Sequence, residues 1–115
     1  MKKNFILAIF FFLLIVQTGF AQKLEFITDW TSAQERAQME NKQILVVLTG
    51  SEWCAPCKKM DKNVFENEQF IAYAQQNLIL FLVDLPGGGL VMNSKVCQDY
   101  QFFKNKYDAK ARIPF

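Results

Sequence analysis

The chain has 115 residues, enough for one domain, because single domains mostly contain roughly 100–200 residues. Hydrophobic residues make up 51% and charged residues 21%, with 5 Gly and 3 Pro, which excludes collagen-like and low-complexity classes. The net charge of +2 equals the charge of Lys2 and Lys3, so the rest of the chain has no excess of basic residues that would predict nucleic-acid binding. The sequence has no His, which excludes His-dependent catalysis and His-ligated metals.

The first 21 residues have the three-part pattern of a secretory signal peptide. Lys2 and Lys3 form a positive start, residues 5–16 form an unbroken apolar run, and small residues lead to Ala21, where we expect cleavage. The run is shorter than the roughly 20 residues that cross a hydrocarbon core, although an uncleaved anchor stays open as the alternative. We therefore expect residues 22–115 to be periplasmic or secreted, in a compartment where disulfides persist. The membrane is then involved only in export.

The mature chain is predicted to open with a strand, a helix and a second strand. Residues 24–27 alternate in polarity and predict a short strand, and residues 30–41 predict a helix. Thr31 or Ser32 can cap this helix, because a short hydroxyl side chain accepts hydrogen bonds from its first free amides. Residues 44–48 are continuously apolar and rich in β-branched side chains, which is typical of a strand buried on both faces of a parallel sheet.

The second half of the mature chain continues this alternation. A helix is expected over residues 54–63, and Asn67 can cap another over residues 68–77. The apolar run over residues 78–83 predicts a second buried strand, which Asp84 closes. A Gly-rich loop then precedes a last helix, which Asn93 or Ser94 begins. Its apolar positions at helical spacing are Val96, Tyr100, Phe103 and Tyr107. The order β-α-β-α-α-β-α predicts an α/β fold with parallel strands.

The stretch that carries chemistry is Trp53-Cys54-Ala55-Pro56-Cys57-Lys58. It follows a predicted strand and opens a predicted helix, with Pro56 stiffening the first turn. Two thiols at this spacing at a helix start lie within disulfide distance. The positive end of the helix dipole and its unpaired N–H groups stabilise a thiolate at Cys54, the outermost sulfur. We expect Cys57, one turn further in, to be shielded.

The pair predicts thiol–disulfide exchange that needs no bound cofactor. Cys54 attacks a disulfide in a partner protein, and Cys57 then attacks Cys54 and releases the reduced partner. The partners are therefore protein disulfide substrates and a thiol protein that donates electrons. Two alternatives stay open: a static Cys54–Cys57 staple, and a metal site in which Cys97 is a third thiolate.

The sequence around these cysteines resembles the thioredoxin-like family, in its secreted bacterial branch of thiol–disulfide oxidoreductases. The matching stretches are residues 50–60, Val64-Phe65, residues 83–86 and Ile113-Pro114. The resemblance covers the whole mature chain and implies a thioredoxin-like α/β fold. It also implies that Pro114 is the family's cis-proline beside the CxxC pair, and that the backbone of Ile113 pairs with an extended substrate segment.

The neighbours of the cysteines have both functional and structural interpretations. We expect Trp53 to pack over the pair and to offer partners a flat apolar surface, with simple packing as the alternative. We expect Ala55 and Pro56, between the cysteines, to tune the redox reactivity of the pair. Lys58 either raises the local positive potential or lies on a solvated helix face. Cys97 is expected to be a half-buried inert thiol next to the apolar stripe of the last helix.

The chain departs from the family pattern in two respects. It stops at Phe115, where the resemblance implies a further hairpin and helix, so we expect a C-terminally incomplete domain. The uncovered sheet edge suggests an alternative function, a module that binds another protein by strand addition. The predicted strand 44–48 also lacks the buried acid of cytoplasmic thioredoxins, so we expect Glu52 or water to move protons in its place.

Overall fold

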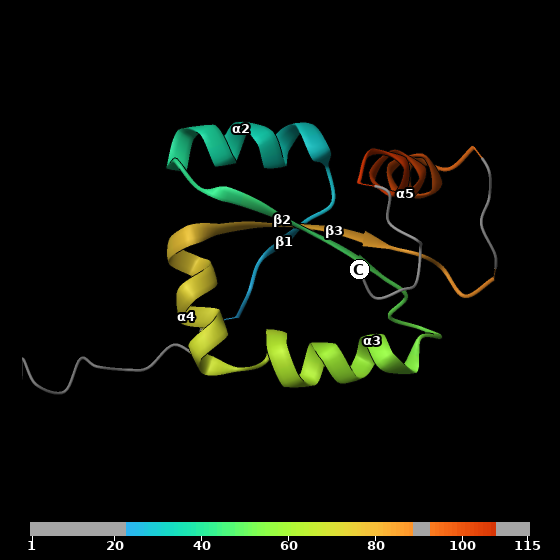
Figure 1. The fold of residues 1–115 in the computed structure, drawn as a ribbon, viewed down its shortest axis with the longest axis horizontal. Coiled ribbons are helices and arrows are strands. Elements are labelled where there is room, and N and C mark those ends of the chain that lie inside the picture. The colour runs from blue at the N-terminus through green and yellow to red at the C-terminus, as the bar shows by residue number, and fades with distance from the viewer. Residues whose placement is uncertain (1–22, 89–92, 108–115) are drawn as a thin grey trace, which may run out of the picture.

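A computed structural model describes residues 23–88 and 93–107, so that the expected signal peptide, Ile113 and Pro114 lie outside the described residues. A three-stranded parallel sheet of order β1-β3-β2 lies between two layers of helices (Figure 1). The strands are β1 (Phe26–Ile27), β2 (Gln43–Thr49) and β3 (Leu78–Asp84). The helices are α2 (Trp30–Glu40), α3 (Ala55–Met60), the π-helical segment η1 (Asp61–Phe65), α4 (Glu68–Asn77) and α5 (Lys95–Lys106). The predicted α/β order is confirmed.

β3 is the central strand and sends its side chains alternately to the two helical layers. Ile79, Phe81 and Val83 join one buried cluster with residues of α2 and α5, the helices drawn above the sheet in Figure 1. Leu80 joins a second cluster with Ala74 of α4, on the opposite face. This alternation is the period of two that a strand imposes, and it gives each face of the sheet its own core.

The prediction that residues 44–48 are buried on both faces is wrong for the first part of β2. Ile44, Leu45 and Val46 are half-buried, whereas Val47 and Leu48 are buried. The reason is the place of the strand in the sheet. Among the described strands β2 pairs only with β3, so one of its edges has no described neighbour.

The first helix begins at Trp30, as predicted, but its N-cap lies two residues before the nearer of the expected caps. Asp29, and not Thr31 or Ser32, is the N-cap of α2, and its carboxylate accepts the backbone N–H of Ser32 at 2.9 Å. Asn41 ends the helix in the left-handed conformation, with φ of 51°. Asparagine tolerates this conformation because its short polar side chain bonds locally.

The helix that follows the CxxC motif is longer than predicted. α3 continues without a break into η1 and reaches Phe65, because the N–H of Glu66 bonds to the carbonyl of Asp61, five residues back. Such π turns are frequent at functional sites. Asn67 caps α4, as expected, and α5 is capped by Ser94, one of the two residues expected to begin it.

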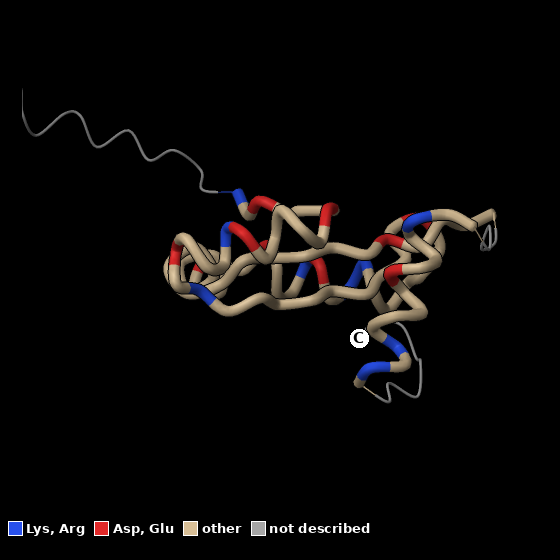
Figure 2. The backbone as a smooth tube through the Cα atoms, turned by 90° about the horizontal axis from the view of Figure 1, so that it is seen from above, with Lys and Arg blue, Asp and Glu red and all other residues tan. Residues whose placement is uncertain are grey.

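Charges of both signs are spread along the described backbone (Figure 2). Arg36 bridges Glu25 and Glu40, and Lys95 lies near Asp29 and Asp99.

No described helix combines the length and the apolar character that crossing a membrane requires.

Candidate active site

The two cysteines of the motif lie where the loop after β2 enters α3, and a disulfide joins them. Their Cα atoms are 5.2 Å apart. Cys54 is the N-cap of α3, and its sulfur accepts the backbone N–H of Cys57 at 3.2 Å. The first amides of a helix have no intrahelical acceptor, so this sulfur occupies the place of a capping oxygen.

Both cysteines are buried, and the residues between them are exposed. Cys57 has no exposed surface, as predicted, but Cys54 is itself only 4% exposed. Ala55 and Pro56 lie at the surface. Cys54 was predicted as the outermost sulfur; its exposed fraction is indeed the larger of the two, although both are small.

Hydrogen bonds join the loop before Cys54 to the end of β3. The backbone N–H of Leu85 donates to the carbonyl of Thr49 at 2.8 Å, which extends the pairing of β2 and β3 by one step. The carboxylate of Asp84 accepts the backbone N–H of Ser51 at 2.8 Å and also its hydroxyl. Asp84 therefore ends its strand, as predicted, and also fixes the loop.

Trp53 is held over this loop by one hydrogen bond and by contact with Gly50. Its indole Nε1 donates to the carbonyl of Leu85 at 2.9 Å, while the residue remains 51% exposed. A Cβ atom added at Gly50 would meet the indole ring at 2.5 Å. The absence of a side chain at this position lets the indole lie against the backbone, next to the disulfide-bonded pair.

Replacing Gly50 by Ala is therefore expected to displace Trp53 and break its bond to Leu85. The loss in the free energy of unfolding is expected to be about 1–3 kcal/mol, as for other overpacked sites. Fluorescence of Trp53 in a Trp30→Phe background, together with chemical denaturation, measures both effects. Gly88→Ala is the matched control, because nothing lies within 4 Å of a Cβ at that position. Equal behaviour of the two variants would contradict the prediction.

The two charged neighbours of the motif both contact the loop backbone. Lys58 is exposed, and its Nζ donates to the carbonyl of Glu52 at 3.1 Å. The carboxylate of Glu52 accepts the backbone N–H of Gly87 at 3.3 Å. Glu52, expected to replace the missing buried acid, thus ties the loop to the segment that follows β3.

A family model described as thioredoxin-like matches residues 25–107 of the sequence. The chain belongs to the thioredoxin-like family. This confirms the family and the fold that the motif, its position and the order of elements predicted.

Two relatives are informative about this thioredoxin-like chain. It is similar to the disulfide bond reductase DsbH of Chlamydia pneumoniae, with 32% identity over 57 residues, which are 50% of this chain and 34% of that protein. The solved structure of a DsbH oxidoreductase matches with a TM-score of 0.66 and 25% identity, over 87% of this chain and 69% of that one. The chain thus spans about a third of the length of the curated relative.

Sequence reasoning missed one acid of this thioredoxin-like domain. Asp61 lies on the inward side of the α3–η1 segment, where Cys57 is buried and Met60 is half-buried. Burial raises the pKa of the Asp61 carboxyl, and the nearby charges of Asp84 and Glu66 raise it further. The sequence held a signal for it, because Asp61 is four residues after Cys57 and so shares its helix face.

The third cysteine is fully buried, and the prediction of a half-buried thiol is wrong. Cys97 is 1% exposed and lies on the same side of α5 as buried Tyr100 and Phe103. The three positions are three residues apart, so Cys97 belongs to the apolar stripe itself. In the part of the chain that the structure describes, no group of three Cys, His, Asp or Glu side chains could hold a metal ion.

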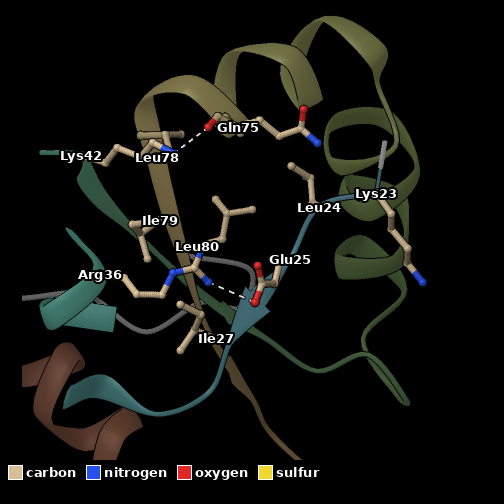
Figure 3. Close-up of a pocket in the computed structure, with 11 residues that line it drawn as sticks. Lys23, Leu24, Glu25, Ile27, Arg36, Lys42, Gln75, Leu78, Ile79 and Leu80 are labelled. Atoms are coloured by element: carbon tan, nitrogen blue, oxygen red, sulfur yellow. Dashed lines mark hydrogen bonds and ion pairs between the residues drawn. The ribbon is translucent and has the colours of Figure 1, made fainter. Parts of the chain in front are cut away.

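A cavity of about 170 Å³ lies at the other end of the sheet, where β3 begins (Figure 3). Its polar rim is already paired: Arg36 bonds Glu25 at 3.0 Å, and Lys42 donates to the carbonyl of Gln75 at 2.7 Å. The CxxC motif follows the opposite, carboxyl end of β2, so the cavity is not part of the candidate active site.

Proposed function

We propose that this thioredoxin-like domain is an exported thiol–disulfide oxidoreductase, with Cys54 as nucleophile and Cys57 as resolving thiol. The observation that carries the proposal is the disulfide at the start of α3, with the Cys57 amide donating to the Cys54 sulfur. Similarity to a disulfide bond reductase favours reduction of partner disulfides as the working direction.

The reaction consists of two exchange steps. The Cys54 thiolate attacks one sulfur of a partner disulfide; a Cys54–partner bond forms, and the other partner sulfur leaves as a thiolate. Cys57 then loses its proton and attacks Cys54. The Cys54–Cys57 bond forms, and the remaining partner sulfur leaves with the electron pair. Two electrons have passed to the partner, and a donor dithiol protein restores the reduced pair.

The surface around the motif suggests how a partner is held. Trp53, Ala55 and Pro56 are exposed beside the two buried sulfurs, and together they offer a mainly apolar contact surface. Ile113 and Pro114, to which the family resemblance assigns a part in substrate binding, lie outside the described residues. The substrates on this proposal are proteins of the periplasm or of the secreted fraction, reached after cleavage near Ala21.

The proposal is tested by the rate at which Cys54 of the reduced protein is alkylated by iodoacetamide as pH is varied. A Cys97→Ala background restricts the signal to the two motif cysteines, and Cys57→Ser isolates Cys54. We expect Cys54 to titrate well below the value of about 8.5 for a free thiol. Alkylation that follows the titration of a free cysteine throughout would contradict the proposal.

A further inference from the structure

The inward face of the helix that carries Cys57 holds a carboxylate where an apolar residue is expected. Cys57, Met60, Asp61 and Phe65 are the inward positions of α3 and η1, whereas the two lysines after Cys57 are exposed. α3 lies on the lower face of the sheet in Figure 1. A carboxylate on such a face is costly without a cationic partner. None of the ion pairs among the described residues involves Asp61.

Asp61 lies within helical reach of Cys57. The backbone N–H of Asp61 donates to the carbonyl of Cys57, so the two residues are stacked on successive turns. Side chains four apart on a helix have Cβ atoms about 5–6 Å from each other, a separation that an Asp side chain and a thiol can bridge. The acid is therefore placed next to the resolving thiol and not next to Cys54, which caps the helix.

The neighbouring carboxylate has a different role. The carboxylate of Asp84 accepts both the backbone N–H and the hydroxyl of Ser51, which fixes it at the end of β3. The negative charge of Asp84 adds to burial and to Glu66 in raising the pKa of Asp61. With its pKa raised, the Asp61 carboxyl takes up a proton more readily than an ordinary aspartate does.

A buried hydroxyl faces the same space. Thr49 is the register partner of Asp84, so both side chains lie on one face of the sheet. The side chain of its neighbour Leu48 packs into the opposite core with α2 and α5, which places Thr49 on the α3 face. Among the described residues the Thr49 hydroxyl is buried and has no hydrogen-bond partner. Thr49 and Asp84 thus place two polar side chains on the face of the sheet where α3 lies.

We propose that Asp61 accepts the proton of Cys57 when that thiol attacks the mixed disulfide, and returns it when the donor reopens the pair. This inference rests on the proposed function. The S–H bond of Cys57 breaks and the proton passes to the Asp61 carboxylate. The Cys57–Cys54 bond forms, the Cys54–partner bond breaks, and its electron pair leaves with the partner sulfur. Asp61 thereby takes the role that the sequence assigned to Glu52 or water.

The test follows the two steps separately in the reduced Cys97→Ala protein. One equivalent of dithiobis(nitrobenzoate), a chromophoric aromatic disulfide, releases one coloured thiolate when Cys54 attacks and a second when Cys57 resolves the mixed disulfide. Stopped-flow absorbance resolves both phases. Asp61→Asn is compared with Asp61→Glu, which keeps the carboxyl, and with Glu68→Gln, an exposed acid of α4.

In Asp61→Asn we expect an unchanged first phase and a second phase slowed at least about tenfold near neutral pH, since a positioned general base contributes at least that much. The pH profile of the second phase should lose the inflection that belongs to Asp61. Asp61→Glu should recover part of the rate, and Glu68→Gln should match the parent. A second phase that keeps its rate and pH profile in Asp61→Asn would overturn the inference. A first phase no faster than that of free cysteine would instead overturn the proposed function.

Stability supplies an independent readout. The pKa of Asp61 is raised above its ordinary value of 3.8 in the folded chain, so the folded state holds the proton more tightly than the unfolded state. As pH rises from the unfolded-state pKa of Asp61 through its folded-state pKa, ionisation of this carboxyl lowers the free energy of unfolding. The whole of this loss is present above the folded-state pKa. Asp61→Asn should unfold at higher denaturant concentration than the parent at about pH 7 but not at about pH 4. A variant that is less stable at neutral pH would show a structural role and overturn the inference.

Discussion

Replacing Cys54 by Ser is expected to lower the rate of disulfide reduction by at least about a thousandfold, because removal of a nucleophile leaves only binding and positioning to act. The hydroxyl of Ser does not ionise near neutral pH, and the amide of Cys57 is too weak a donor to change that. Turnover of a model protein disulfide with dithiothreitol as electron donor measures the effect.

Replacing Cys57 by Ser has a different expected outcome. Cys54 still attacks, but nothing displaces the partner, so a mixed disulfide accumulates and can be isolated on a non-reducing gel. Cys97→Ser is the matched control, because Cys97 is buried in α5 and takes no part in the proposed exchange. Full activity in Cys54→Ser, or loss of activity in Cys97→Ser alone, would contradict the assignment of roles.

The largest expected effect on stability is that of Phe81→Ala. Phe81 has no exposed surface at the centre of β3, and its ring lies 5.1 Å from that of Trp30 and 5.5 Å from that of Phe103. Truncation leaves a cavity between the sheet and its upper helical layer and is expected to cost about 3–5 kcal/mol. Native domains are stable by about 5–15 kcal/mol, so the variant is expected to be partly unfolded at room temperature.

Urea denaturation of the parent and the variant measures this loss. Tyr73→Ala is the control, since Tyr73 is 57% exposed on α4 and its loss should change stability by about 0.5 kcal/mol or less. A Phe81→Ala protein that loses no more than the Tyr73→Ala protein would show that the core on this face of the sheet carries little of the stability.

The order of elements was predictable because its signals are local. Asn67 was predicted as a cap, and Ser94 as one of two candidates, because Asn and Ser supply the acceptor that a helix start needs. The cap of α2 was misplaced at Thr31 or Ser32, because three of the four residues 29–32 can cap a helix and only the fold shows that Asp29 is the cap. The burial of β2 was overestimated, because burial depends on the place of a strand in the sheet, and the composition of β2 does not show that one of its edges has no described neighbour.

In the candidate site, too, the features set by neighbouring residues were predictable, and those set by residues far apart in the sequence were not. The cysteine pair was predictable because its two members are three residues apart at the start of one helix. The contacts that shape its surroundings join residues more than 30 positions apart, such as Ser51 with Asp84 and Glu52 with Gly87. They depend on the register of β2 against β3, which periodicity does not specify. Asp61 is the exception, because its position on the helix face of Cys57 could have been read from the sequence.

The bonds between the loop and the end of β3 have a consequence for the energetics of turnover. Ser51, Glu52 and Trp53 are each held by a group from residues 84–87, and none of these bonds involves either sulfur. On the proposed function, opening and closing the disulfide would leave these bonds intact, so each cycle would need little reorganisation of the scaffold. The loop and the end of β3 would then act as a rigid platform on which only sulfur–sulfur bonds are exchanged.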